Sequence, residues 1–463
     1  MYPKKPPQVS LPVINAYAAG IDVGSRSHFL AVGQNPEDVL EFSVNTSGHN
    51  QAIAFLKQHQ IRTIAMESTG SYWQTLFCVL QEAGFQVLLV PGNQTTNARG
   101  KTDVKDCQWI QKLHSLGMLS GSFLPDAMTL KLRTLTRHRE SLVETVAKYT
   151  LKVQKCLRLM NIRLDIAIRD VAGKSGRAII KSILAGERSA QALSELADPR
   201  VKKSQKELAE LLNGQWNDEL LYELKDCYEL MELHEQRIGC CDLEIEKILS
   251  QCPVITSSIG ESEAPLNADI KSTSKAVALV KKQEKGKHKC TANLSVHCYE
   301  LLGVDIFAVP GIGPGVALTF ISEMGLGIFK FPTAKHFASW LRLTPNNRIS
   351  GGKILSSRTE KSRNTLTKAL RAAANAIGRL KSEDYLAHFF RKIAYKKGWG
   401  AAITATARKI AVILWKMIVV QQQYSPQQPE EYLNQIKLRK LKYLQKDIKK
   451  HGITMAEVSM LFS

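Results

Sequence analysis

The sequence predicts an α/β domain near the N-terminus, a long helical spacer, and a compact α-helical domain near the C-terminus. Apolar runs of strand length, of which Ala16–Val23 and Ile61–Met66 are the clearest, alternate with helical patterns over the first 126 residues. Leu, Ile and Val then recur at three- and four-residue steps from Met128 to Leu249. Further helical patterns extend from about Tyr299 to Gln422.

The N-terminal elements follow the order of a mixed sheet covered by helices. Three strands come first, and helix and strand then alternate. The predicted strands are Ala16–Val23, His28–Val32, Val39–Val44, Ile61–Met66 and Phe85–Val90, and the predicted helices are Gln51–His59, Ser71–Ala83 and Thr102–Leu116.

The helical spacer has two strong segments, Leu130–Met160 and Ser204–Ser250, and we expect the second to continue past Gly214 and Trp216. Together they indicate a coiled-coil hairpin, a geometry that can also pair protomers.

The formal net charge of +21 is concentrated in the C-terminal part of the chain. Residues 1–126 hold nine basic and nine acidic side chains, whereas residues 330–463 hold 26 basic and 7 acidic ones, a net charge of +19. Such a field attracts a polyanion, because binding releases condensed counterions. The charge therefore favours a nucleic-acid partner over a merely soluble basic surface.

The sequence also indicates a cytoplasmic protein. No apolar run reaches the ~18 residues that a membrane helix needs, and the N-terminus lacks the apolar segment of a signal peptide. The nine cysteines are scattered and lack zinc-binding spacing, which favours free thiols in a reducing compartment.

Four carboxylates stand where a sheet would bring them together. Asp22 closes the first strand in GIDVGS, and Glu67 closes a later strand in AMESTG. Asp103 and Asp106, three apart in KTDVKD, share one face of a predicted helix. Strand ends at the C-terminal edge of an open sheet converge on one crevice, where four carboxylates repel one another unless divalent cations neutralise them.

Mg²⁺ prefers such oxygen ligands. Two ions about 3.5–4 Å apart would hold the attacking and leaving oxygens of a phosphodiester exchange. Each carboxylate alone is weak evidence, because an aspartate at a strand end is more often a cap. The ordered set, however, resembles the RNase H-like nucleases of the RuvC resolvase type. GIDVGS also resembles the phosphate loop of sugar kinases and actin-like ATPases, but the sequence lacks the second lobe that those proteins need.

A glycine-rich segment, VPGIGPGV at Val309–Val316, precedes a predicted helix. Gly311 and Gly313 would let backbone N–H groups approach a phosphate at the helix N-terminus. The segment resembles the hairpin of helix-hairpin-helix DNA-binding proteins. A tight turn between core helices explains it equally well.

Ser350 lies in a flexible SGG segment among cations. Its basic neighbours are Arg348, Lys353 and Arg358. A hydroxyl in this setting can attack a phosphate while the cations offset the charge of the transition state, although a serine in a glycine-rich loop is usually only a turn residue. No histidine lies nearby to form a Ser-His-Asp triad. Further basic residues expected to hold the nucleic-acid backbone are Arg363, Arg371 and Lys409.

Together these motifs resemble one family, the DEDD-type insertion-sequence transposases, which are related to the Piv DNA invertase. The matching segments, in the family's order, are GIDVGSRSHFLAV, AMESTGSYW, GKTDVKDCQWIQKLHSLG, VPGIGPGVALTFISEMG and LTPNNRISGG with the following TLTKALRAAA. They cover both ends of the chain. The middle helices match only in character, and residues 251–299 depart from the family in length and polarity.

The resemblance implies a role for each motif. Asp22, Glu67, Asp103 and Asp106 would be the DEDD tetrad of a RuvC-like domain, holding Mg²⁺ as two ions. Ser350 matches the serine of the family's Ser-Gly motif, which forms a covalent link to DNA. Family members act as oligomers, which implies a homo-oligomer of two or four chains. They act on donor and target DNA, with which a non-coding bridge RNA pairs.

We therefore expect RNA-guided transposition or recombination of an insertion sequence, in the bacterial cytoplasm at the nucleoid and away from membranes. Two alternatives are a metal-dependent junction resolvase that uses water, with Ser350 structural, and a non-catalytic nucleic-acid-binding protein. The expected segments are a RuvC-like nuclease domain at 15–126, a coiled-coil spacer at 127–250, a polar linker or insertion at 251–299, a helical transposase domain at 300–424 and a basic tail at 425–463.

Overall fold

The computed structural model describes residues 11–96, 102–252, 290, 293–362, 364–380 and 384–425, with 437–438, 441–445, 448 and 451 near the C-terminus. The chain divides between Leu124 and Pro125 into two compact units. Arg363, most of the 251–299 segment and most of the basic tail lie outside the described residues. Over the described ranges, no helix is long and apolar enough to cross a bilayer.

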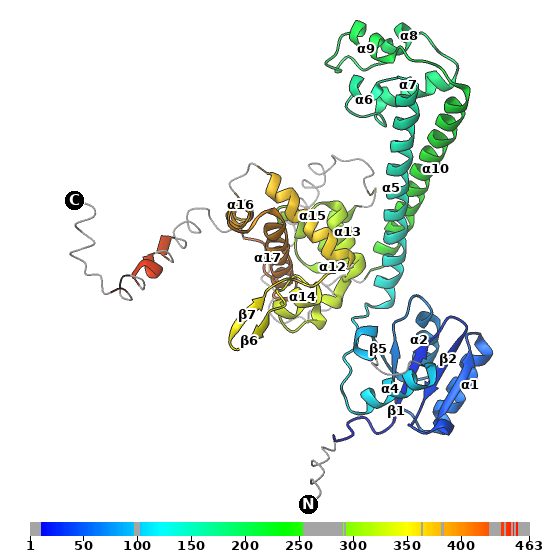
Figure 1. Ribbon diagram of the computed structural model, residues 1–463, viewed down its shortest axis with the longest axis vertical. Helices are drawn as coiled ribbons and strands as arrows, with labels where there is room; N and C mark the ends of the chain where they lie inside the picture. Colours follow the sequence, from blue (N-terminus) through cyan, green and yellow to red (C-terminus); the bar gives the residue numbers. More distant parts are fainter. Residues whose placement is uncertain are drawn as a thin grey trace, which may run out of the picture. The chain divides into compact units, whose positions relative to one another are not determined.

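A five-stranded mixed sheet forms the centre of the N-terminal unit (Figure 1). Its strands are β1 (Ala18–Val23), β2 (Ser27–Ala31), β3 (Val39–Ser43), β4 (Thr63–Glu67) and β5 (Gln86–Val90), in the order β3-β2-β1-β4-β5. β2 pairs antiparallel with β1 and β3, whereas β4 runs parallel to β1 and β5. This arrangement confirms the predicted mixed sheet.

Helices cover both faces of this sheet. One face carries Ile21, Leu30 and Met66, all fully buried against α1 and α2. On the other face α4 lies directly over β1, because a Cβ atom added at Gly20 would stand only 2.2 Å from the Gln111 backbone nitrogen. Only glycine permits this approach. The elements are η1 (Pro36–Asp38), α1 (Thr46–Gln58), α2 (Trp73–Glu82), α3 (Gly92–Thr95) and α4 (Asp103–Ser115).

Two long antiparallel helices, α5 (Ala127–Leu159) and α10 (Asp218–Leu249), open the second unit (Figure 1). A buried ion pair between Arg139 and Asp242 crosses their seam, and the Cys241 thiol donates to the Leu135 carbonyl at 3.4 Å. The coiled-coil hairpin that the sequence indicates is therefore present within one chain.

The structure differs from the prediction at Gly214 and Trp216, where a continuous helix was expected. α9 (Gln205–Leu212) ends before Gly214, and α10 begins only at Asp218. The chain turns here onto the end of α5. A Cβ atom at Gly214 would lie 2.4 Å from the Met160 carbonyl oxygen, to which the Gln215 N–H donates at 2.8 Å. This tertiary contact overrides the helical pattern.

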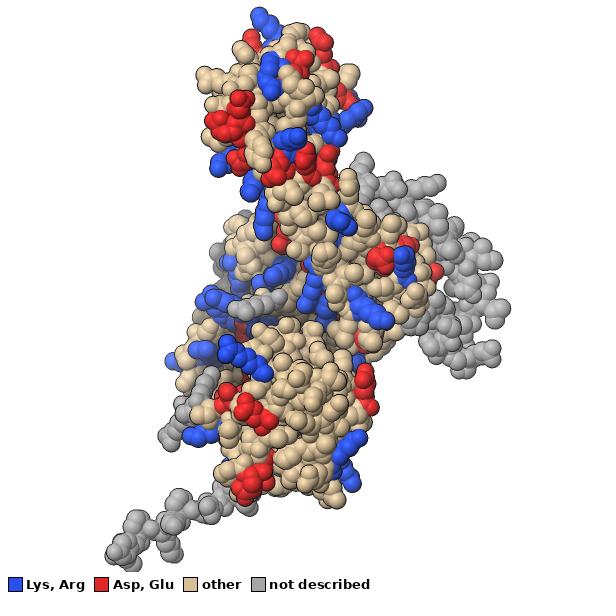
Figure 2. All heavy atoms as spheres, turned by 90° about the vertical axis from the view of Figure 1, so that its right-hand side faces the viewer, with Lys and Arg blue, Asp and Glu red and all other residues tan. Residues whose placement is uncertain are grey.

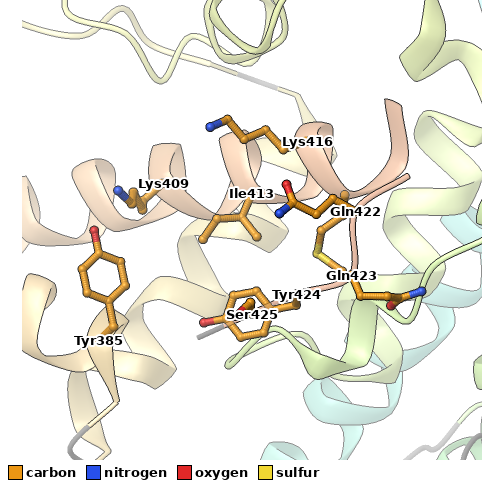
Figure 3. Close-up of a pocket in the computed structure, with 9 residues that line it drawn as sticks. Tyr385, Lys409, Ile413, Lys416, Gln422, Gln423, Tyr424 and Ser425 are labelled. Carbon is orange, nitrogen blue, oxygen red and sulfur yellow. The ribbon is translucent and has the colours of Figure 1, made fainter. Parts of the chain in front are cut away.

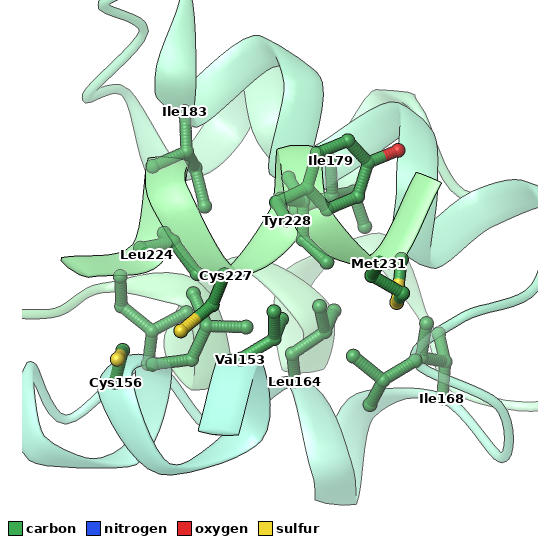
Figure 4. Packing of buried hydrophobic residues seen from close by; sticks show 14 of the residues in the cluster. Val153, Cys156, Leu164, Ile168, Ile179, Ile183, Leu224, Cys227, Tyr228 and Met231 are labelled. Atoms are coloured by element: carbon green, nitrogen blue, oxygen red, sulfur yellow. The ribbon is translucent and has the colours of Figure 1, made fainter. Parts of the chain in front are cut away.

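Short helices close the tip of the hairpin. Their apolar sides form one cluster with α5 and α10, in which Ile179 and Ile183 meet Leu224 and Cys227 (Figure 4). Lys/Arg and Asp/Glu side chains are mixed on the surface of this tip (Figure 2). The tip helices are α6 (Leu164–Ala167), α7 (Lys174–Leu184), α8 (Ala190–Glu195) and α9.

The remaining helices form a compact C-terminal domain around three fully buried rings, Phe320, Phe337 and Phe390. Glu323 joins this domain to α5, because its buried carboxylate pairs with Arg137 Nε at 2.8 Å and Arg133 Nε at 3.1 Å. The helices are α12 (Leu294–Leu302), η3 (Ile306–Ala308), α13 (Pro314–Glu323), η4 (Gly325–Lys330), α14 (Ala334–Trp340), α15 (Thr365–Arg379), α16 (Tyr385–Lys397) and α17 (Trp399–Val419).

Candidate active site

The sheet register brings Asp22 and Glu67 to neighbouring strand ends. Ile21 pairs with Met66 in the parallel β1–β4 ladder, so the next residues, Asp22 and Glu67, lie side by side. Because α4 crosses β1 closely at Gly20, its first turn lies at the same edge. That turn carries the other two carboxylates, Asp103 and Asp106. We call these four residues the acidic tetrad.

Asp22 lies near the other three carboxylates of the acidic tetrad, which all act on its charge. Burial is the largest cause that raises the pKa of Asp22 to about 6, followed by repulsion from Glu67, Asp103 and Asp106. A hydrogen bond from the Val23 N–H only partly offsets these effects. Asp22 is therefore within electrostatic reach of each of the other three carboxylates.

Two threonines orient Glu67. The Thr95 hydroxyl donates to one carboxylate oxygen at 2.5 Å, and the Thr69 hydroxyl donates to the other at 3.0 Å. Gly92 lies so close that an added Cβ atom would meet Glu67 Oε1 at 2.7 Å. Thr95 belongs to none of the predicted motifs, although its position soon after β5, the neighbour of β4, is a signal that strand order supplies.

The first turn of α4 suits its carboxylates. Thr102 caps the helix by accepting a hydrogen bond from the Lys105 N–H at 3.3 Å. Asp103 and Asp106 follow within one turn, where the helix dipole favours negative charge. The KTDVKD motif therefore serves as a helix start and also faces the sheet edge.

The acidic tetrad offers only oxygen donors, as Mg²⁺ prefers. Across the described parts of the chain, no three Asp, Glu, His or Cys side chains converge tightly enough to enclose an ion. The coupling around Asp22 nevertheless sets four carboxylates around one edge of the sheet. They do not share one centre, and their oxygen chemistry is of the kind that suits a divalent cation.

Ser350 lies at the tip of an exposed β-hairpin, where the sequence predicts only a loop. β6 (Arg348–Ser350) and β7 (Lys353–Ser356) pair antiparallel, with Ser350 opposite Lys353. Gly351 and Gly352 form the two-residue turn with φ of 54° and 75°. A type I′ turn needs positive φ at both central residues, which explains the SGG motif.

The two faces of the hairpin differ in chemistry. Because residues opposite each other share a face, Ser350 and Lys353 project to one side. The register shifts between Arg348 and Ile349, so regular alternation ends before Arg348. Ile349 and Ile354 occupy the other side, each 62% exposed. The hairpin therefore presents a serine beside a lysine on one face and an apolar surface on the other.

The base of the hairpin is held by polar contacts. Glu360 accepts a hydrogen bond from the Asn346 side chain at 2.9 Å and pairs with Arg342. The Asn346 N–H donates to the Arg358 carbonyl at 3.2 Å, while Arg342 also donates to the Lys361 carbonyl. These contacts position the base while the tip stays exposed.

Two family models match the chain. Residues 19–162 match a transposase model of DEDD-type IS110 elements, and residues 306–388 match the model described as Transposase IS116/IS110/IS902 family. The chain belongs to the IS110 family of DEDD-type transposases. No curated protein matches it. The first range contains the whole acidic tetrad and the second contains Ser350.

Membership of the IS110 family establishes several of the sequence predictions. The N-terminal unit is an RNase H-like domain, and the protein is a DNA recombinase that acts on DNA. DEDD-type transposases depend on a divalent metal, typically Mg²⁺.

Four other residues of this IS110-family transposase are predicted from the sequence to contact nucleic acid, and they differ in their packing and exposure. Gly311 packs against α15, since an added Cβ atom would lie 2.9 Å from the Ala373 carbonyl oxygen, and it has a positive φ. Gly313 faces open space at the start of α13. Arg371 is half-buried on α15, and Lys409 on α17 lies 5.1 Å from the Tyr385 ring centroid.

Proposed function

We propose that this transposase cuts and rejoins DNA through a covalent link between Ser350 and a DNA phosphate, guided by a bridge RNA. The proposal is carried by one combination of features: four coupled carboxylates at a sheet edge, and an exposed serine at the tip of a cationic hairpin. Both lie within the ranges that match transposase models.

The serine would exchange one phosphodiester for another. Ser350 Oγ forms a bond to the scissile phosphorus, and the phosphorus–oxygen bond to one deoxyribose breaks. The released sugar hydroxyl carries the proton that the serine gives up. Because the phosphoserine link conserves the energy of the broken bond, a second DNA hydroxyl can reverse the step and rejoin strands.

The side chains around Ser350 and those of the acidic tetrad would have different roles in this reaction. Lys353, opposite Ser350 in the hairpin, and Arg348, two residues earlier on β6, would stabilise charge on the phosphate. The acidic tetrad would hold two Mg²⁺ ions, with Glu67 oriented by Thr95 and Thr69. The bound ions would supply charge neutralisation and polarisation at the scissile phosphate.

The role of the tetrad is tested by strand cleavage in Mg²⁺. Asp22→Ala and Glu67→Ala should each lower cleavage on the order of 100-fold or more, while DNA and RNA affinity stays within about twofold, since residues 1–126 carry no net charge. Glu41→Ala, which removes an exposed carboxylate from β3, is the control and should cleave normally. Tetrad variants that cleave at near wild-type rates would refute the assignment.

The net charge of +19 over residues 330–463 and the family membership support the proposed RNA guidance. Binding should weaken steeply with salt, because each neutralised phosphate contributes about −0.9 for duplex DNA or −0.7 for a single strand to the log–log slope. RNase treatment of the purified protein should abolish site-specific recombination, and re-addition of the RNA transcribed from the element should restore it. Recombination that survives complete RNA removal would exclude a guide.

A further inference from the structure

A small cavity lies in the C-terminal domain between α16, α17 and the segment that follows α17 (Figure 3). Its volume is about 230 Å³, and its lining includes Tyr385, Lys409, Lys416 and Tyr424. Cavities that bury drug-sized ligands have volumes of roughly 300–1,000 Å³. This cavity is therefore suited to a single ring system of modest size.

The two tyrosines give the cavity its aromatic walls. They come from different segments, since Tyr385 opens α16 and Tyr424 lies beyond the end of α17, and in Figure 3 the Tyr424 hydroxyl points toward the side where Tyr385 stands. That hydroxyl is buried and has no hydrogen-bond partner within the described part of the chain. Burial raises the pKa of Tyr424 to about 12, so the hydroxyl stays protonated and can donate to a ligand.

Two lysines of α17 also line the cavity. Lys409 and Lys416 stand seven residues apart on α17, which places both on one side of the helix. The Lys409 ammonium lies 5.1 Å from the centroid of Tyr385 and 5.8 Å from that of Phe389. Neither lysine forms an ion pair with a carboxylate among the described residues, so both ammonium groups are available to an anion.

We propose that this cavity receives one unpaired nucleotide, with its base against Tyr385 and Tyr424 and its phosphate at Lys409 and Lys416. Aromatic walls beside cations are the combination that holds single-stranded nucleic acid, because every base has a stacking face and every nucleotide has a phosphate. A base pair does not fit so small a volume. The proposal rests on the protein's action on nucleic acid, and the nucleotide can come from an RNA loop or an opened DNA strand.

The test measures the affinity of full-length Ser350→Ala protein, in EDTA, for fluorescent oligouridine, oligothymidine and a blunt DNA duplex. Tyr424→Leu should weaken single-strand binding about 5- to 150-fold, the range expected for one stacked base. Lys416→Gln should also weaken it, through the lost phosphate contact. Duplex binding should change less than about twofold. Matched controls are Tyr395→Leu, whose ring is 93% exposed elsewhere on α16, and Lys335→Gln on α14.

Tyr424→Phe separates the loss of a ligand contact from a folding defect, because it keeps the ring and removes only the hydroxyl. It should bind single strands more weakly than wild type and melt at the same temperature. Loss for oligouridine alone would identify RNA as the source of the nucleotide, and loss for oligothymidine alone would identify DNA. Equal losses for single strand and duplex, or losses no larger than those of the controls, would overturn the proposal. Because no cleavage occurs in this assay, its failure would leave the role of Ser350 untouched.

Discussion

Asp22 is a candidate metal ligand, and its charged form also destabilises the folded protein. Burial and the other tetrad carboxylates raise its pKa to about 6, so the folded protein binds more protons than the unfolded chain between about pH 4 and pH 6. Stability contributed by the protonated form is therefore lost as pH rises through this window. A divalent cation would relieve the repulsion at neutral pH.

Asp22→Asn should therefore stabilise the N-terminal unit in EDTA at pH 8, by about 1–2 kcal/mol. Mg²⁺ should raise the unfolding midpoint of wild type but not of the variant. Urea unfolding followed by tryptophan fluorescence measures the effect, and Trp73 and Trp109 are the two of the chain's six tryptophans that report on this unit. Glu37→Gln, which neutralises an exposed carboxylate of the same unit, should show neither change. A destabilised Asp22→Asn protein would contradict the repulsion.

A second pair of titrating residues lies inside the same unit. His28 and His49 stack with ring centroids 6.1 Å apart, and both are buried. Burial, then the neighbouring His49, lowers the pKa of His28 to about 4, and burial lowers the pKa of His49. Burial therefore favours the neutral form of both rings in the folded protein.

Acid should destabilise this unit through His28. Between pH 6.5 and pH 4 the unfolded chain binds more protons, so stability falls as pH drops, by up to about 3 kcal/mol from this residue. His28→Phe should flatten the dependence of unfolding free energy on pH over that window, whereas His59→Gln, on the exposed end of α1, should leave it unchanged. An unaltered pH profile in His28→Phe would show that His28 is already charged in the folded state.

At the scale of elements, local patterns predicted the N-terminal strands to within about two residues at each end. Alternating apolar runs and strand-end carboxylates are short-range signals, so Asp22 and Glu67 could be placed at one edge from the sequence. The contacts that orient Glu67 could not be predicted from the sequence, because Thr95 lies near Glu67 only through the pairing of β4 with β5. The break at Gly214 was missed for the same reason, since its cause is a contact with Met160, 54 positions earlier in the sequence.

The β6–β7 hairpin makes the role of its turn testable. Gly351 has a φ of 54° and open space around it, so only backbone strain opposes a side chain there. Gly351→Val should lower DNA cleavage about tenfold or more without changing the melting temperature, because the turn that presents Ser350 would be distorted. Gly351→Asn should retain most activity, since Asn tolerates positive φ.

Gly400→Ala controls for the added side chain, because that position in α17 also has open space but no positive φ. It should cleave like wild type. Full cleavage by Gly351→Val would mean that the hairpin turn does not position the nucleophile.

At the scale of the whole molecule, the acidic tetrad and Ser350 belong to separate units. In the sequence, the long helices α5 and α10 lie between them. We expect the tetrad of one subunit to act with Ser350 of another. Asp22→Ala and Ser350→Ala proteins, each inactive alone, should recover single-strand cleavage when mixed under conditions of subunit exchange. The DNA should then be attached only to the Asp22→Ala subunit. If mixed oligomers form and no attachment returns, both residues act within one subunit.

The most direct test of the proposed chemistry is to trap the protein–DNA adduct and map it. Wild-type protein with Mg²⁺, its RNA and a DNA substrate should give a band stable to denaturation, whose peptide carries a nucleotide on Ser350. Ser350→Ala should abolish the band, and Ser357→Ala, which removes an exposed hydroxyl beyond the same hairpin, should keep it. Cleavage by wild type with no adduct, or an adduct on another residue, would contradict a serine nucleophile at position 350.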